Sequence, residues 1–154
     1  MKRSDSRFNP EPAASAEVRA VYAELARRPA NRNCVRIKEC CHFKLTGRSP
    51  LLTKGEARLA ARALRQTGRT RLPTVSSGAC PFLESTTGNC LIYESRPFGC
   101  RTHFCAAAGG PYARKEVLDL IRRLEQVDVN LGGDGVHRIE EAVQAALVDM
   151  SDSR

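Results

Sequence analysis

Apolar residues recur at helical spacing in two stretches of the first half of the chain, and each stretch has a recognisable start. In the first, Ser15 is the expected N-cap, and the helix is expected to end near Arg28, just before a proline. In the second, Thr53 and Glu56 have the spacing of a capping box. This predicts a helix that begins after Thr53, runs to about Gln66 and is followed by a glycine.

Two more helical stretches lie in the C-terminal third, on either side of a glycine-rich turn at residues 132–135. Pro111 suits the first turn of a helix, and both stretches are expected to be packing helices within residues 111–149. Residues 1–14 are polar and are expected to form a disordered arm, which leaves residues 15–150 as one small, mainly α domain. The positions expected to be buried are Val18, Val21, Tyr22, Leu25, Leu59, Ala60, Ala63, Leu64, Val117, Leu118, Ile121, Leu124, Val127, Val136, Ile139, Val143, Ala146 and Leu147.

All seven cysteines fall in the two stretches without helical periodicity, residues 29–52 and 70–110. A non-helical stretch as long as the second is uncommon in a compact domain unless something organises it. Loops and turns are predicted there, with one short extended piece, and a bound metal would organise them. The cysteines are Cys34, Cys40 and Cys41 in the first stretch, and Cys80, Cys90, Cys100 and Cys105 in the second. The helical domain is therefore expected to surround a loop-rich metal centre lined by cysteines.

Composition favours a metal over a disulfide framework. Aromatic residues make up 5% of the chain and tryptophan is absent, so a metal that ties loops together would add stability to a thin core. The basic N-terminus has no apolar segment behind it, and no run of about eighteen apolar residues occurs, so neither a secretion signal nor a membrane helix is expected. The expected compartment is the cytoplasm, which keeps thiols reduced, and an odd number of cysteines cannot all pair within one chain.

Thiolate sulfur is a soft ligand that suits both zinc and iron–sulfur clusters, so the residues alone leave that choice open. The spacing is not that of a standard zinc finger, and adjacent cysteines such as Cys40 and Cys41 rarely both bind one small ion. His103 lies between two cysteines and is a further candidate ligand, and His42 is a weaker one.

The segment from Cys80 to Arg101 resembles the C-terminal signature of the YkgJ-like bacterial cysteine-cluster family, whose domain is described as zinc- or iron-chelating. That signature runs Cys-Pro-Phe-Leu, Gly-x-Cys, Ile-Tyr-x-x-Arg-Pro and Cys-Arg. It is met by residues 80–83, 88–90, 92–97 and 100–101. The resemblance implies a zinc or iron–sulfur domain and implies no particular reaction.

The N-terminal signature of that family resembles Cys-x-x-Cys-x-x-Cys-Cys. Cys34, Cys40 and Cys41 fit its first, third and fourth positions, whereas Ile37 stands at the second and cannot bind a metal. Cys105 or His103 is a candidate to replace the missing ligand. The resemblance spans roughly residues 34–105 of the chain.

Arg96 and Arg101 are candidate cofactor-binding residues within the same signature. Four thiolates on a divalent ion leave a site net negative, so a nearby cation would offset that charge and donate hydrogen bonds. The alternative is that both arginines bind loop carbonyls.

Positive charge is concentrated in the N-terminal half: residues 1–71 carry 17 Lys and Arg against 6 Asp and Glu, and residues 72–154 carry 8 against 11. One stripe on the predicted second helix consists of Arg58, Arg62, Arg65 and Arg69. Such a face suits an anionic protein or a nucleic acid, although few aromatic residues accompany it for base stacking. The ordinary alternative is a solvated helix face.

The leading hypothesis is a metal-binding protein that holds zinc or an iron–sulfur cluster for a structural, electron-transfer or sensing role. One alternative is a metalloenzyme, or an accessory subunit of one, with an open metal position. Another is an RNA-binding module in which zinc is structural and the arginine stripe supplies affinity. No catalytic motif is recognisable in the chain, so enzymatic activity stays open.

Overall fold

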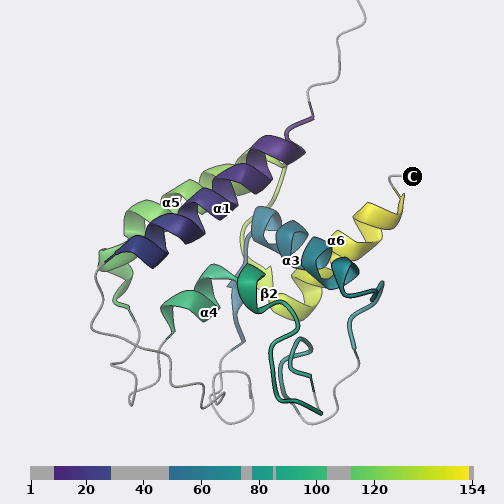
Figure 1. The fold of residues 1–154 in the computed structure, drawn as a ribbon. Coiled ribbons are helices and arrows are strands. Elements are labelled where there is room, and N and C mark those ends of the chain that lie inside the picture. The colour runs from purple at the N-terminus through teal and green to yellow at the C-terminus, as the bar shows by residue number, and fades with distance from the viewer. Residues whose placement is uncertain (1–8, 29–48, 74–77, 85, 104–111, 153–154) are drawn as a thin grey trace, which may run out of the picture.

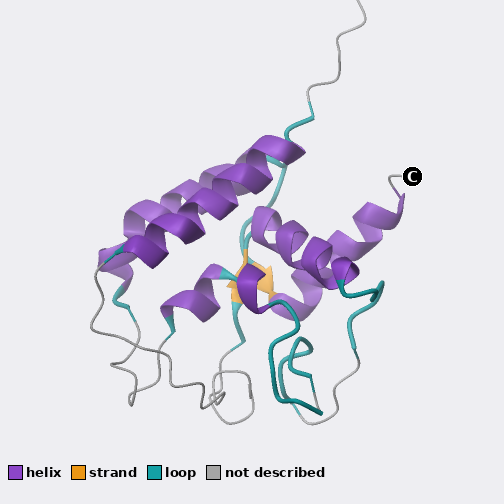
Figure 2. Cartoon of the chain, viewed as in Figure 1, coloured by secondary structure: helices purple, strands orange, loops and turns teal. Residues whose placement is uncertain are grey.

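The computed structural model describes residues 9–28, 49–73, 78–84, 86–103 and 112–152. The predicted mainly α class is confirmed, because helices dominate and the described strands form one two-stranded sheet (Figures 1 and 2). In chain order the elements are α1 (Glu11–Arg27), β1 (Leu51–Leu52), α3 (Lys54–Gln66), the 3-10 helix η2 (Tyr93–Ser95), α4 (Phe98–Thr102), α5 (Arg114–Asn130), β2 (His137–Arg138) and α6 (Ile139–Asp152).

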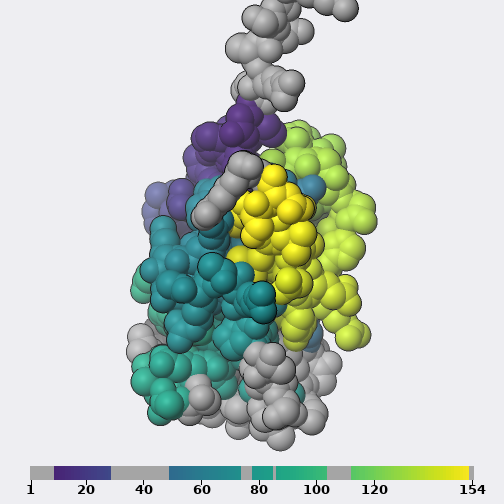
Figure 3. All heavy atoms as spheres, turned by 90° about the vertical axis from the view of Figure 1, so that its right-hand side faces the viewer, coloured from purple at the N-terminus to yellow at the C-terminus, as the bar shows by residue number. Residues whose placement is uncertain are grey.

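Helix α3 lies at the centre and separates two clusters of buried side chains. The α6-side cluster joins α3 to α6 and to residues 80–92. It consists of Leu52, Ala57, Ala60, Ala61, Leu64, Cys80, Phe82, Ile92, Ile139, Ala142, Val143, Ala146 and Leu147. The α1-side cluster joins α3 to α1 and α5, and consists of Ala14, Val18, Val21, Tyr22, Leu25, Leu59, Phe98, Val117, Leu120, Leu124 and Val127. Figure 3 shows α6 in yellow at the surface, between teal residues from the middle of the chain and green residues from α5 onward.

Helices α1 and α5 lie side by side and antiparallel (Figure 1). The Arg28 guanidinium, just after α1, donates hydrogen bonds to the Asp119 carboxylate near the start of α5. Farther along the pair, Arg123 Nε donates to Glu17 Oε1 at 2.6 Å. These pairs are partly exposed to solvent, so the buried apolar contacts between the two helices contribute more of the stability.

The first helix begins earlier than the sequence predicts. Helix α1 starts at Glu11, with Pro10 as its N-cap residue, so the assignment of Ser15 as N-cap is wrong and that serine is buried within the helix. A proline in the first turn is compatible with a helix, because the missing N–H would have no intrahelical partner there. Residues 11–14, which were expected to belong to the disordered arm, therefore form the first turn of α1.

The second predicted helix is confirmed, including its capping box. Helix α3 follows Thr53, whose backbone N–H donates to Glu56 Oε2 at 3.0 Å. The helix ends at Gln66, and Gly68 takes a positive φ of 88° just beyond it. That conformation disfavours a side chain and suits glycine.

The small sheet was not predicted. β1 and β2 pair antiparallel, with Leu51 opposite Arg138 and Leu52 opposite His137. The N–H of Ile139, the first residue of α6, donates to the Pro50 carbonyl at 3.0 Å. This pairing fixes where α6 begins, next to the entrance of α3.

Most of the predicted buried positions are buried in the structure, and four of them are not. Ala63, Leu118 and Ile121 are partly buried, and Val136 is 49% exposed because it precedes β2 outside the last helix. Leu120 was not expected in the core and is fully buried. No described helix has the length and apolar character needed to cross a membrane.

The glycine-rich turn after α5 is built around a buried carboxylate. Asp128 accepts hydrogen bonds from the N–H of Lys54 at 2.7 Å and from the N–H of Gly135 at 2.9 Å, so it also caps the start of α3. A Cβ on Gly133 would lie 2.4 Å from Cγ of Asp128, so this position has no room for a side chain. The turn is therefore a structural device, as the sequence suggests.

Candidate metal centre

A short hairpin places Cys80 and Cys90 in the same apolar cluster. The Cys80 carbonyl accepts the N–H of Leu83 at 3.0 Å, which forms the turn of the Cys-Pro-Phe-Leu segment. Leu83 then pairs with Cys90 in an antiparallel bridge, and the N–H of Leu91 donates to the Phe82 carbonyl at 2.8 Å. Phe82 is 1% exposed, so the hairpin is anchored in the α6-side cluster. Two cysteines ten residues apart in sequence are thus brought together by the backbone.

The Cys80 thiol is held in a low-dielectric environment. The residue is 7% exposed, and burial raises the pKa of the Cys80 thiol to about 12, with a smaller contribution from the nearby Cys90. Both cysteines, together with Cys100, are thiols in the structure rather than halves of a disulfide. A metal that binds at Cys80 must displace a proton, so binding there is expected to weaken as the pH falls.

Cys100 and His103 lie on or next to α4, which follows the hairpin. The N–H of Cys100 donates to the Pro97 carbonyl at 3.0 Å, and the N–H of His103 donates to the Gly99 carbonyl at 3.2 Å, which ends the helix. Both residues are partly exposed. Their backbones are therefore fixed by α4, and their side chains are accessible from outside the core.

The first residue of α4 is attached to the core by a buried carboxylate, that of Glu56. Its Oε1 accepts the N–H of Phe98 at 2.8 Å and the hydroxyl of Tyr22 at 3.0 Å. Its Oε2 accepts the N–H and the hydroxyl of Thr53, each at 3.0 Å. Burial raises the pKa of Glu56, and these hydrogen bonds oppose that rise. One side chain thereby joins α1, α3 and α4.

Both signature arginines bind loop carbonyls, which is the alternative considered from the sequence. Arg96 Nε donates to the Tyr93 carbonyl at 3.1 Å. Arg101 Nε donates to the Arg96 carbonyl and its Nη2 to the Glu94 carbonyl, each at 2.7 Å. These bonds fix the loop between η2 and α4. A contact of either arginine with a metal-bound sulfur stays a prediction.

The described residues contain no group of three or more His, Cys, Asp or Glu side chains arranged to hold a metal ion. The other predicted ligands, Cys34, Cys40, Cys41 and Cys105, lie outside the described residues, as does His42. The described donors are nevertheless the soft thiols that zinc and iron clusters require, two of them gathered by one hairpin. The donor chemistry of the described thiols fits such a metal.

The arginine stripe on α3 has an internal partner that the sequence did not reveal. Glu11 of α1 forms ion pairs with both Arg58 and Arg62, and Arg62 also donates to the Ser15 hydroxyl at 2.8 Å. Half of the stripe joins α1 to α3, which weakens the argument for a nucleic-acid face.

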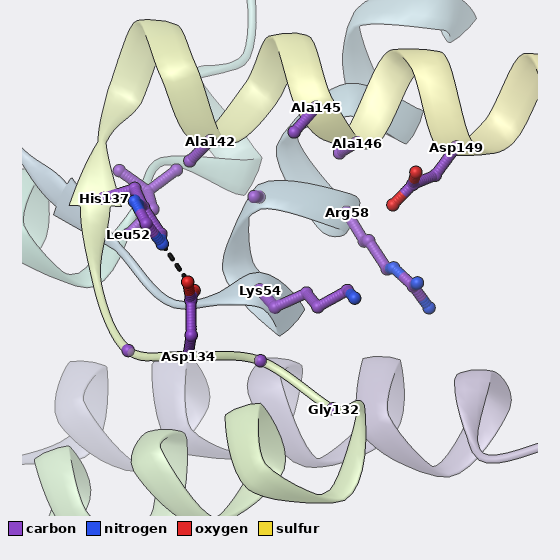
Figure 4. A pocket seen from close by; sticks show the side chains of 13 residues that line it. Leu52, Lys54, Arg58, Gly132, Asp134, His137, Ala142, Ala145, Ala146 and Asp149 are labelled. Carbon is purple, nitrogen blue, oxygen red and sulfur yellow. Dashed lines mark hydrogen bonds and ion pairs between the residues drawn. The ribbon is translucent and has the colours of Figure 1, made fainter.

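A separate hollow of about 340 Å³ lies between α3, α6 and the glycine-rich turn (Figure 4). Lys54 and Arg58 reach into it from α3, and alanines of α6 form one wall. His137 lies 2.6 Å from the Asp134 carboxylate, which raises the pKa of His137. None of the described cysteines lines this hollow, and its charges are of both signs, so it is distinct from the candidate metal centre.

The sequence drew attention to Glu56 and Tyr22, but it did not predict that they contact each other. Glu56 was predicted as part of a helix cap and Tyr22 as one position of an apolar face. The signal for a larger role was the chemistry of the residues themselves. A carboxylate at the third position of a helix and a tyrosine on a buried face both need polar partners when they are buried.

Residues 32–123 match a family model described as "CxxCxxCC: Putative zinc- or iron-chelating domain". The match includes both cysteine stretches and extends into α5, beyond the span of the signatures. No curated protein and no solved structure matches the chain. Because the matched residues make up more than half of its length, the chain belongs to this family of zinc- or iron-chelating domains.

Proposed function

We propose that the protein binds zinc or an iron–sulfur cluster through cysteine thiolates, and that the bound metal joins its two cysteine stretches. The observation that carries this proposal is the hairpin that brings Cys80 and Cys90 together inside the family-matched segment. Thiols gathered in this way, without a disulfide between them, are typical ligands of soft metals.

The proposed ligands come from both stretches. The hairpin would supply Cys80 and Cys90, α4 would supply Cys100, and His103 or Cys105 is a further candidate. Cys34, Cys40 and Cys41 would supply the remaining thiolates. When bound, zinc supplies a closed structural link or a Lewis acid, whereas an iron–sulfur cluster supplies an electron carrier. We place the protein in the cytoplasm, because a reducing compartment keeps these thiols available.

The chain's own residues prepare this site in two ways. The apolar surroundings of Cys80 exclude water and strengthen electrostatic interactions at the sulfur. Arg96 and Arg101 hold the loop between η2 and α4 by bonds to its carbonyls, and they bring positive charge to a site that thiolates make negative.

The test is anaerobic purification of the full chain, followed by elemental analysis and a visible absorption spectrum. Iron and sulfide with a brown colour would identify an iron–sulfur protein, and stoichiometric zinc without colour would identify a zinc protein. Cys80→Ser and Cys90→Ser should each lower the metal content. The control Thr86→Ala changes an exposed residue of the same hairpin and should keep it. A chain that holds neither metal, under reducing conditions and after reconstitution with each, would overturn the proposal.

A further inference from the structure

We propose that Tyr22 and Glu56 are positioning residues for the metal centre, holding α4 and with it the Cys100 thiol and the Arg101 guanidinium. The inference rests on the proposed function, because it takes Cys100 to be a ligand. Tyr22 belongs to α1, which precedes the residues that the family model matches. A helix outside the matched segment would therefore take part in shaping the site.

The first link runs from the core to the start of α4. The Glu56 carboxylate accepts the N–H of Phe98, the first residue of α4, and the Tyr22 hydroxyl on the same oxygen. Glu56 is 3% exposed and Tyr22 5% exposed, so water competes little for these bonds. Cys100 lies two residues after Phe98 in a helix of five residues. A shift at the first residue of so short a helix is transmitted directly to the cysteine.

The second link runs from Tyr22 to the end of α4. The guanidinium carbon of Arg101 lies 4.2 Å from the centre of the Tyr22 ring, which is the geometry of a cation–π contact. The same guanidinium donates to the carbonyls of Glu94 and Arg96, so it closes the loop that leads into α4. Tyr22 therefore contacts α4 in two ways, through its hydroxyl by way of Glu56 and through its ring by way of Arg101.

The chemistry of this arrangement suggests more than packing. A buried carboxylate is costly, and apolar residues of similar size would often serve a fold equally well. What the carboxylate adds is a fixed orientation for each of its donors, from three different elements. Groups that hydrogen-bond to metal ligands typically change metal affinity about 10- to 100-fold when they are lost, and Glu56 and Tyr22 act on Cys100 in the same sense through the backbone of α4.

The test compares metal binding by variants of the full chain in the reduced state. Zinc affinity is measured by competition with a chromophoric chelator, and cobalt(II) replaces zinc as a spectroscopic probe of thiolate coordination. Tyr22→Phe keeps the ring but removes the hydroxyl, and Glu56→Gln removes the charge. Arg101→Lys keeps the charge but loses the planar guanidinium that stacks and bonds two carbonyls. The control is Leu124→Ala, which removes a buried side chain of α5 from the same apolar cluster as Tyr22.

Tyr22→Phe and Glu56→Gln should lower zinc affinity about 10- to 100-fold and weaken the thiolate-to-cobalt absorption, whereas Leu124→Ala should leave both unchanged. Wild-type affinity and spectrum in Tyr22→Phe and Arg101→Lys would overturn the inference, even if Glu56→Gln failed to fold. An equal loss in Leu124→Ala would also overturn it, because the effect would then follow from stability alone. If the wild-type chain bound no metal, the proposed function itself would fail, which is a different result.

Discussion

Replacing Glu56 by glutamine tests how much stability the buried carboxylate contributes. A glutamine has one acceptor oxygen where Glu56 has two, so its amide group must face the N–H of either Phe98 or Thr53. Both residues are buried, so water cannot readily replace the lost acceptor. One buried unsatisfied donor costs about 1–3 kcal/mol, so the free energy of unfolding should fall by about that amount.

The assay is urea denaturation in reductant, with the midpoint and the slope measured for each variant. The control is Glu116→Gln, because Glu116 has the same position in α5 and accepts the N–H of Ala113 at 2.7 Å on an exposed surface. Water can satisfy that N–H, so the control should lose less than about 0.5 kcal/mol. Equal losses in Glu56→Gln and Glu116→Gln would refute the argument that burial makes the Glu56 bonds valuable.

The difference in stability between wild type and Glu56→Gln should depend on pH, and its direction follows from the pKa of Glu56. Burial raises the pKa of Glu56 above its ordinary value of 4.5. The folded state then binds this proton more tightly than the unfolded chain does. The resulting stability is present in full below pH 4.5 and is lost as the pH rises through the folded pKa. The stability advantage of wild type over Glu56→Gln should therefore shrink from pH 4.5 towards neutrality. An advantage that grows with pH would mean that the folded state favours the ionised carboxylate.

Three further predictions concern other parts of the molecule. Gly133→Ala should lower the free energy of unfolding by about 1–3 kcal/mol, since its Cβ would clash with the Asp128 carboxylate. The control Gly99→Ala has ordinary space around its Cβ, so urea denaturation should show little loss of stability in that variant. The pKa of His137, followed by NMR, should lie above 6.5 and should fall in Asp134→Asn; an unchanged value would show that the pair does not persist in solution. Removing the metal with a chelator should lower the thermal midpoint of unfolding, and adding the metal back should restore it. An equal midpoint with and without metal would argue against a contribution of the metal to the stability of the fold.

Much of the helical architecture follows from the sequence because its signals are local. The capping box at Thr53 and Glu56 and the period of apolar residues around Leu59 and Leu64 define α3 within short windows. The start of α1 was missed because Ser15 is a common N-cap residue and the polar residues before it resemble a disordered arm, although prolines at positions 10 and 12 suit the start of a helix.

The parts that sequence could not reveal depend on residues far apart in the chain. The pairing of Leu52 with His137 involves strands of two residues, which carry no alternating pattern to detect. Whether Arg58 faces solvent or an acid depends on where α1 lies, and Glu11 is 47 residues away. For the candidate metal centre, the cysteines and the signature predicted the kind of metal chemistry. That Cys80 lies near Cys90 could be seen only once the structure showed the hairpin between them.

The packing of α6 against α3 has a consequence for synthesis of the protein on the ribosome. Helix α3 leaves the ribosome long before α6, and the buried face that α6 covers stays open until the C-terminal residues arrive. All seven cysteines precede that point, and Cys80 shares its cluster with Ile139 and Val143 of α6. The nascent chain therefore presents its thiols to metals and oxidants before the core that shelters Cys80 has closed.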